Sequence, residues 1–245
     1  MTGPTIAAFR PDDERATDAA KLLESLGATP VIDPMLAVEP TGALPRTDAA
    51  YVILTSVTGV ELASDGDWSS GDAVVCAIGS PTAEALREAG YAVEIVPDEY
   101  TSSGIVETLA AEIEGQCVEV ARSDHGSDVL TDGLNEAGAY VHETVLYRLV
   151  RPADAGRSAE LAAENELDAA LFTSSLTVEH FLDAAEERGI FDAALDGLDD
   201  AVVGAIGDPT RRTAETLGVA VDVVPEIETF DALARAAVAV VEHEG

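Results

Sequence analysis

The sequence contains very little positive charge. Of its 245 residues, 13 are lysine or arginine and 47 are aspartate or glutamate, which gives a formal net charge of −34 at pH 7. Lys21 is the single lysine, and the arginines are spread thinly along the chain. Because capture of a phosphate backbone needs clustered basic side chains, this composition excludes a general nucleic-acid binder. An anionic membrane surface would repel the chain for the same reason.

Long apolar runs and paired cysteines are also missing. The longest apolar stretch, near residues 232–241, is interrupted by Arg235 and is too short to span a bilayer. The N-terminus lacks the basic and apolar regions of a signal peptide, so we expect a cytoplasmic protein. Cys76 and Cys117 occur in apolar, strand-like runs without a CxxC spacing, and we expect both to be buried small hydrophobic residues outside any disulfide.

The excess of acidic residues needs a physical explanation, because self-repulsion of this size destabilises a compact chain at ordinary ionic strength. Hydrophobic residues make up 47% of the sequence, so the chain can bury a core and is not a disordered acidic tail. At molar salt the Debye length falls to about 3 Å, which largely screens repulsion between surface carboxylates. The composition therefore indicates a halophilic protein. An acidic face for a cationic partner is a second interpretation, which the scattered positions of the carboxylates disfavour.

Short apolar runs rich in valine and isoleucine alternate with helical patterns along the chain. This alternation is typical of βαβ units and predicts an α/β fold with largely parallel sheets. Residues 13–26 are expected to form an amphipathic helix that ends before Gly27. The expected strands are residues 5–9, 29–33, 50–54, 73–77, 92–96, 117–121, 140–145, 169–172, 202–206 and 220–224.

An internal repeat organises the chain. The segment Ala-Ile-Gly-Ser-Pro-Thr at 77–82 recurs as Ala-Ile-Gly-Asp-Pro-Thr at 205–210, and the same offset relates Pro97 to Pro225. A second pair, Leu-Thr-Ser at 54–56 and Phe-Thr-Ser at 172–174, has its own constant offset. A looser third pair sets Arg10 against Arg122, each at the end of an expected strand. The chain is therefore built from two similar halves.

Two clusters of breaker residues place the domain boundaries. One lies between residues 34 and 45 and the other between 151 and 156, whereas residues 105–116 read as a continuous helix up to Gly115. We therefore predict two similar α/β domains joined by a double linker, with the linkers at 35–40 and 149–154. One domain comprises residues 41–148, and the other, discontinuous in sequence, combines 1–34 with 155–245. A ligand is expected in the cleft between them.

The familiar catalytic motifs are absent. There is no P-loop, GxGxxG, GxSxG or HExxH motif, and the four histidines lack zinc-site spacing, so we expect no metal. The sequence offers strand-to-helix turns rich in hydroxyl side chains instead. They are Thr55-Ser56, Ser80-Pro81-Thr82, Thr101-Ser102-Ser103-Gly104, Thr173-Ser174-Ser175 and Asp208-Pro209-Thr210. Each could be an ordinary helix cap, but several turns in one cleft would offer N–H and hydroxyl donors to carboxylates or phosphates.

The order and spacing of these motifs resemble the uroporphyrinogen-III synthase family. The resemblance rests on the paired Thr-Ser turns, the two Gly-x-Pro-Thr turns, the Ser-Ser-Gly-Ile segment at 102–105 and the run from 137 to 148, and it covers nearly the whole chain. A member of this family would cyclise the linear tetrapyrrole hydroxymethylbilane, with inversion of its last pyrrole ring and loss of water. The resemblance thus implies a cofactor-independent lyase of tetrapyrrole biosynthesis, acting in the interdomain cleft on a substrate with eight carboxylates. We expect it to be a monomer.

The resemblance also implies roles for individual residues. Tyr147 matches a family tyrosine proposed to assist departure of the substrate hydroxyl, and is the expected catalytic residue. Thr82 and Thr210 match threonines of turns that would bind acetate or propionate groups. Arg10 and Arg122 could pair with carboxylates bidentately. The other expected substrate-binding residues are Thr55, Ser56, Ser102, Ser103 and Ser174.

Each of these residues could also have a purely structural role, and the function also has an alternative. Tyr147 could be a linker or core aromatic residue, the arginines could be surface residues, and the hydroxyl side chains could be helix caps. The alternative function is a non-catalytic two-domain sensor or binding protein for a small polyanionic ligand. Separation of the type I and type III isomers after incubation with hydroxymethylbilane would distinguish the two functions.

Overall fold

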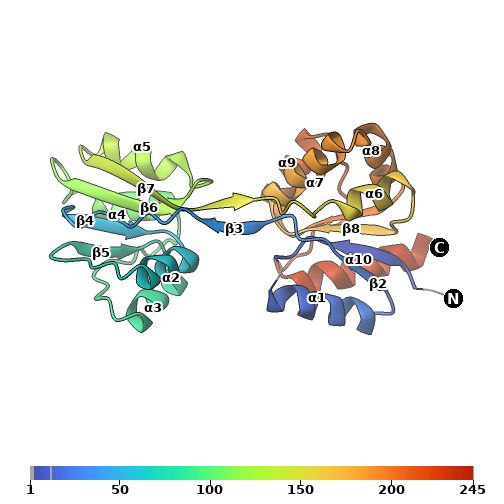
Figure 1. Ribbon diagram of the computed structural model, residues 1–245, viewed down its shortest axis with the longest axis horizontal. Helices are drawn as coiled ribbons and strands as arrows, with labels where there is room; N and C mark the ends of the chain where they lie inside the picture. The colour runs from blue at the N-terminus through green and yellow to red at the C-terminus, as the bar shows by residue number, and fades with distance from the viewer. Residues whose placement is uncertain (1–2, 12, 245) are drawn as a thin grey trace. The chain divides into compact units, whose positions relative to one another are not determined.

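The computed structural model describes residues 3–11 and 13–244 and divides the chain into two compact units (Figure 1). Unit 1 comprises Met1–Ala37 and Val150–Gly245, and unit 2 comprises Val38–Leu149. Each unit contains a sheet with parallel strands and helices on both faces, which confirms the predicted α/β class. No helix in the described part of the chain combines the length and the apolarity that a bilayer crossing requires.

Unit 1 is built on a four-stranded parallel sheet in the order β2-β1-β8-β9. The strands are β1 (Thr5–Ala8), β2 (Thr29–Ile32), β8 (Ala169–Phe172) and β9 (Val202–Ala205). The helices are α1 (Glu14–Ser25), α6 (Arg157–Ala163), α7 (Ser175–Glu187), α8 (Phe191–Asp199), α9 (Asp208–Thr216) and α10 (Phe230–Glu244). Side chains of successive strand residues point to opposite faces, so Ile6 packs with α1 and α10 while Ala7 packs with α6 to α9.

Unit 2 is built on a five-stranded sheet in the order β3-β7-β6-β4-β5. The strands are β3 (Ala37–Pro40), β4 (Tyr51–Leu54), β5 (Val74–Ala77), β6 (Cys117–Ser123) and β7 (Tyr140–Val150). The helices are α2 (Val57–Asp65), α3 (Ser80–Glu88), α4 (Ser102–Leu109) and α5 (Asp128–Glu136). Helices α2 and α3 enclose one core, and α4 and α5 enclose the other on the opposite face of the sheet.

The internal repeat is also present in the geometry. Glu94 accepts a hydrogen bond from the Val75 N–H over 2.9 Å, and Asp222 accepts one from the Val203 N–H over 2.8 Å, at the offset found in the sequence. The expected strands at 92–96 and 220–224 were wrong in extent, because each makes only a single bridge, to Cys76 and Gly204 respectively. In each unit a carboxylate side chain thus accepts from a strand N–H that would donate to a backbone carbonyl in a regular ladder.

Three further expectations differ from the structure. The helix expected at 105–116 ends at Leu109, because the chain folds back through Gly115 at φ 73° to start β6. Residues 37–40 of the predicted first linker form β3, whose proline is tolerated because the strand lies at the sheet edge. Strand β7 continues to Val150, beyond the expected end at Val145, and so enters the second predicted linker.

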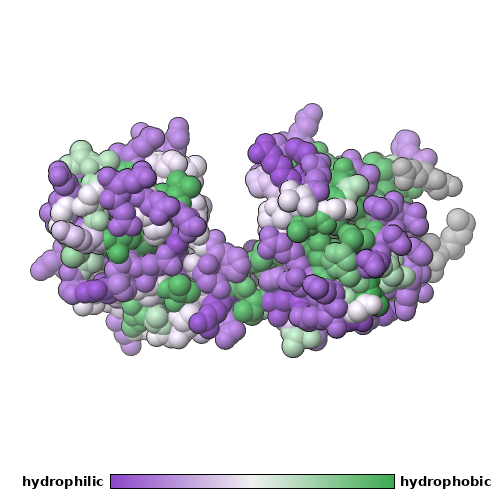
Figure 2. All heavy atoms as spheres, turned by 90° about the horizontal axis from the view of Figure 1, so that it is seen from above, coloured by the Kyte–Doolittle hydropathy of each residue, from purple (hydrophilic) through white to green (hydrophobic). Residues whose placement is uncertain are grey.

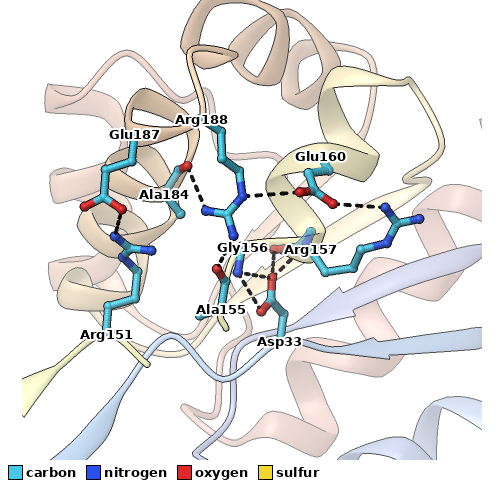
Figure 3. Close-up of polar contacts among 10 residues, drawn as sticks. Asp33, Arg151, Ala155, Gly156, Arg157, Glu160, Ala184, Glu187 and Arg188 are labelled. Carbon is cyan, nitrogen blue, oxygen red and sulfur yellow. Dashed lines mark hydrogen bonds and ion pairs between the residues drawn. The ribbon is translucent and has the colours of Figure 1, made fainter. Parts of the chain in front are cut away.

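A buried carboxylate joins the two chain segments of unit 1 (Figure 3). Asp33, which is 3% exposed, follows β2 and accepts hydrogen bonds from the Gly156 N–H (3.0 Å), the Ser158 N–H (2.7 Å) and the Ser158 hydroxyl. These N–H groups belong to the first turn of α6, where a helix lacks intrahelical acceptors. Asp33 therefore acts as a helix cap supplied from more than a hundred residues away, and its negative charge suits the helix N-terminus.

Two arginines surround this cap (Figure 3). Arg188 donates to the Ala155 carbonyl over 2.6 Å and pairs with Glu160, and Arg151 pairs with Glu187. Gly156 has φ 111°, and a methyl group added there would lie 2.5 Å from the Arg188 guanidinium. The chain is thus held both where its first segment leaves unit 1, near Asp33, and where its second segment enters unit 1, near Gly156.

The two cysteines differ in exposure, which corrects the expectation that both are buried. Cys76 lies in the core on β5, whereas Cys117 is the first residue of β6 and is exposed. A residue at the start of a strand can leave the core even when the residues after it are buried.

This difference predicts the outcome of thiol labelling. Burial raises the pKa of the Cys76 thiol to about 12, so at pH 8 this thiol is both inaccessible and protonated. We expect a maleimide reagent to modify one thiol per native molecule and two per denatured molecule, as counted by mass spectrometry. Cys117→Ser should abolish native labelling, and rapid modification of both native thiols would contradict this burial.

Candidate active site

A pocket of about 240 Å³ lies within unit 2, where β4 and β6 end. Carboxyl ends of parallel strands meet at one edge of a sheet, which is where α/β proteins bind ligands. The pocket is lined by Thr55, Ser56, Ile78, Ser102, Arg122, Ser123, Gly126, Ser127, Leu130 and Tyr147. Five of these residues were expected from the sequence to belong to the site, namely Thr55, Ser56, Ser102, Arg122 and Tyr147.

The Tyr147 hydroxyl is held in this pocket by a short chain of hydrogen bonds. It donates to the Ser56 hydroxyl over 3.0 Å, and Ser56 in turn accepts from the Gly59 N–H over 3.0 Å as the N-cap of α2. The Tyr147 side chain is 7% exposed and packs against the core on the α2 and α3 side. The ring is therefore held by core packing, and its hydroxyl is directed at a helix cap.

A register shift places Tyr147 at the pocket. Arg122 of β6 pairs with Val145 of β7, but the next residue, Ser123, pairs with Tyr147 and not with Leu146. One extra residue in a strand changes which side chains face a given side of the sheet. The irregularity thus brings the tyrosine next to the end of β6.

Arg122 lines the pocket, and each of its two terminal nitrogens already has a partner. Its guanidinium is buried, donates to the Ser127 carbonyl over 2.6 Å and forms an ion pair with Glu143. Its Nε–H has no partner among the described residues, and leaving a buried donor unpaired costs about 1–3 kcal/mol. The charge that was expected to meet a substrate carboxylate is therefore shared with Glu143, and Nε is the guanidinium nitrogen without a partner among the described residues.

The loop at 123–127 was missed from the sequence, although it carries a readable signal. Ser127 caps α5 just as Ser56 caps α2, so this turn belongs with the hydroxyl-rich turns noted above. Gly126 permits the arrangement, because an added methyl group would lie 2.7 Å from both Nε and Nη1 of Arg122. No sequence pattern identified Glu143 as the partner of Arg122.

Two expected residues of unit 2 lie outside the lining of this pocket. Thr82 is buried in the first turn of α3, and Ser103 is exposed in the first turn of α4. Helix α3 has Gly79 as its N-cap and lacks a side-chain cap, so its first N–H groups are open to a ligand or water.

The expected residues of unit 1 lie at the corresponding edge of their own sheet. Arg10 follows β1, with its guanidinium 5.2 Å from the centre of the Phe230 ring. Burial lowers the pKa of Arg10, and the charge of Arg15 acts in the same direction. Ser174 follows β8 and caps α7, and Thr210 is buried in the first turn of α9. Among the described residues of the chain, no group of three or more acidic, histidine or cysteine side chains could hold a metal ion.

The chain forms two α/β units with parallel sheets, and each has hydroxyl-rich turns at the carboxyl ends of its strands. These features place it in the class of two-domain α/β proteins with sites at such turns. The family model of the uroporphyrinogen-III synthase HemD matches residues 17–235. The chain belongs to the uroporphyrinogen-III synthase family, which confirms the resemblance seen in the sequence.

Individual relatives agree with this assignment. A putative uroporphyrinogen-III synthase of Methanothermobacter thermautotrophicus is 32% identical over 254 residues, covering 97% of this chain and 99% of the relative. The uroporphyrinogen-III synthase of Chlorobaculum parvum is 25% identical, covering 95% and 97%. In fold, the chain is similar to the uroporphyrinogen III synthase of Thermus thermophilus, with a TM-score of 0.69, 20% identity and coverage of 99% and 100%. The enzyme from Helicobacter pylori gives a TM-score of 0.60 at 15% identity, with coverage of 97% and 99%.

Proposed function

We propose that this protein closes hydroxymethylbilane to uroporphyrinogen III, with inversion of the last pyrrole ring and loss of water. Membership of the family supports the reaction. The observation that carries our assignment of the site is the Tyr147 hydroxyl held by Ser56 in a pocket lined by hydroxyl groups and the Arg122 guanidinium.

The proposed mechanism relies on positioning. The substrate loses its hydroxyl readily, because the pyrrole nitrogen supplies an electron pair to the adjacent carbon and forms an azafulvene. The departing hydroxyl and the pyrrole N–H proton together account for the water that is lost. The substituted carbon of the last ring then attacks the azafulvene carbon to form a spiro intermediate, which rearranges to the inverted product. Holding these two carbons together lowers the entropic barrier, and the reaction requires no cofactor.

Roles follow for the residues of unit 2. Tyr147 turns its donor from Ser56 to the departing hydroxyl and assists its loss. The Nε–H of Arg122 and the hydroxyls of Thr55, Ser56 and Ser102 bind substrate carboxylates or their hydration water. The remaining proposed substrate-binding residues, Arg10, Thr82, Ser103, Ser174 and Thr210, lie at the ends of strands or in first helical turns, where backbone donors add to their side chains.

Isomer analysis tests the function directly. The protein is incubated with hydroxymethylbilane made enzymatically, and the type I and type III uroporphyrinogens are separated after oxidation. We expect type III, whereas buffer alone yields the uninverted type I isomer. Type I alone in the presence of folded protein would contradict the proposal and favour a binding protein for polyanionic ligands.

We also propose that the enzyme acts as a monomer in the cytoplasm, the setting that suits a biosynthetic lyase without a cofactor. Sedimentation equilibrium gives the mass in solution. A mass near 25 kDa supports the monomer, and a stable dimer contradicts it.

The net charge predicts that stability depends on salt. The chain carries −34, and hydrophilic residues cover most of the visible face of unit 2 and border an apolar area on that of unit 1 (Figure 2). Lowering KCl from about 3 M to about 50 mM lengthens the Debye length from under 3 Å to more than 10 Å, so carboxylates repel one another over longer distances. We expect the Tm measured by circular dichroism to fall steeply over this range, and activity on the polyanionic substrate to fall with it. NaCl at equal ionic strength should act alike if screening is the cause, and an unchanged Tm at about 50 mM salt would refute the prediction.

A further inference from the structure

Three exposed large hydrophobic residues of unit 2, here called the apolar rim, are close in sequence to residues that line the candidate pocket. They are Val57, Tyr100 and Val129. Each lies within two residues of a side chain that lines the pocket, respectively Ser56, Ser102 and Ser127. Apolar side chains thus occur at or just before the starts of α2, α4 and α5, in a chain with a net charge of −34.

Tyr100 is the largest member of this rim and is held rigidly. Its side chain is 58% exposed, yet its hydroxyl lies 2.6 Å from the Ser80 hydroxyl. Its ring rests on Gly79, where an added methyl group would lie 3.0 Å from both Cβ and Cγ of the tyrosine. An exposed aromatic ring fixed at both ends loses little further freedom when a flat ligand packs against it.

The internal repeat shows that an aromatic residue is not required to cover such a glycine. The residue equivalent to Tyr100 in unit 1 is Glu228, and the glycine equivalent to Gly79 is Gly207. A methyl group added to Gly207 would lie 2.5 Å from a Glu228 carboxylate oxygen. The same turn is therefore covered by a carboxylate in unit 1 and by an aromatic ring in unit 2. A ring attracts a flat apolar face without repelling an anionic ligand.

We propose that Tyr100 positions the substrate by stacking against the face of one of its pyrrole rings. This inference rests on the proposed function and extends it to a residue that no sequence motif assigned. Hydroxymethylbilane presents flat rings whose carboxylates project from the ring edges. A ring seated on Tyr100 leaves those carboxylates free to reach the open N–H groups at the start of α3 and the hydroxyls of the pocket.

Kinetics of four proteins test the stacking. Tyr100→Ala should raise KM for hydroxymethylbilane about three- to tenfold, the range of an aromatic contact, with kcat within about twofold of the parent. Tyr100→Phe keeps the ring and should stay within about twofold of the parent in both constants. Tyr140→Ala is the matched control, because this tyrosine is 70% exposed but starts β7, at the opposite end of the strand from Tyr147. It should behave as the parent.

Salt separates stacking from an ionic effect. The increase in KM for Tyr100→Ala should be the same at about 1 M and about 3 M KCl, since a neutral contact is not screened. Equal KM values for Tyr100→Ala and Tyr140→Ala, or equal values for Tyr100→Phe and Tyr100→Ala, would overturn the stacking while leaving the synthase function intact. A parent protein that forms no type III isomer would overturn the proposed function and this inference together.

Discussion

Asp33→Ala is expected to lower the free energy of unfolding of unit 1 by about 3–5 kcal/mol. The carboxylate accepts from two backbone N–H groups and one hydroxyl at the start of α6, all in a buried setting. Removing it leaves Gly156 and Ser158 with buried donors that lack partners, at about 1–3 kcal/mol each. Among the described residues, it also removes the one side chain near the end of β2 that hydrogen-bonds to the first turn of α6.

Two spectroscopic signals distinguish unit 1 from unit 2 in this measurement. The single tryptophan, Trp68, is buried in unit 2, so its fluorescence reports on that unit, whereas far-ultraviolet circular dichroism reports on both. In urea titrations at constant high KCl, Asp33→Ala should move the circular dichroism transition to lower urea and leave the Trp68 transition near the parent.

Asp13→Ala provides the control for a lost helix cap. Asp13 caps α1 by accepting from the Arg15 N–H, but it does so at the surface. Water can replace an exposed cap, so this variant should cost about 1 kcal/mol. If the two substitutions destabilise the protein equally, burial adds nothing to the Asp33 cap and the expected result is wrong.

Tyr147→Phe is expected to slow formation of the type III isomer about tenfold to a hundredfold, mainly in kcat. The substitution removes the one hydroxyl proposed to donate to the leaving group and keeps the ring that packs in the core. Because azafulvene formation is facile without help, the effect belongs at the low end of general-acid contributions. The lost hydrogen bond to Ser56 should cost only about 0.5–1.5 kcal/mol of stability.

A second tyrosine separates catalysis from stability. The Tyr91 hydroxyl is also a donor in unit 2, to the Trp68 carbonyl over 2.8 Å, and it does not line the pocket. Tyr91→Phe should therefore lose comparable stability and retain the parent kcat. If Tyr147→Phe matches Tyr91→Phe in kcat, the phenol has no chemical role and only positioning remains.

The fold class and half of the candidate site were readable from the sequence for one reason. Apolar strand runs locate the sheets, and polar residues directly after those runs must gather at one sheet edge. Thr55, Ser56 and Arg122 follow this rule, and they do line one pocket. The repeat at 77–82 and 205–210 likewise marked equivalent turns, each with a glycine N-cap.

The remaining features depend on register and on neighbours that are distant in sequence. The irregular pairing that sets Ser123 opposite Tyr147 has no local signal, because a strand period of two does not reveal an inserted residue. The ion pair of Arg122 with Glu143 depends on that same pairing of β6 with β7. Strand β3 was missed because its short sequence contains a charge and a proline, which only an edge position tolerates.

The order of strands in unit 1 has a consequence for synthesis on the ribosome. Strand β1 lies between β2 and β8, yet β8 begins more than 160 residues later in the chain. Unit 2 is complete once residue 149 has emerged, whereas Val150–Gly245 takes about 5–20 s more to translate. Until β8 has been translated, one edge of β1 has no partner, and an open strand edge is a template for aggregation. The N-terminal segment, although made first, must therefore wait for a strand more than 160 residues away before its sheet can close.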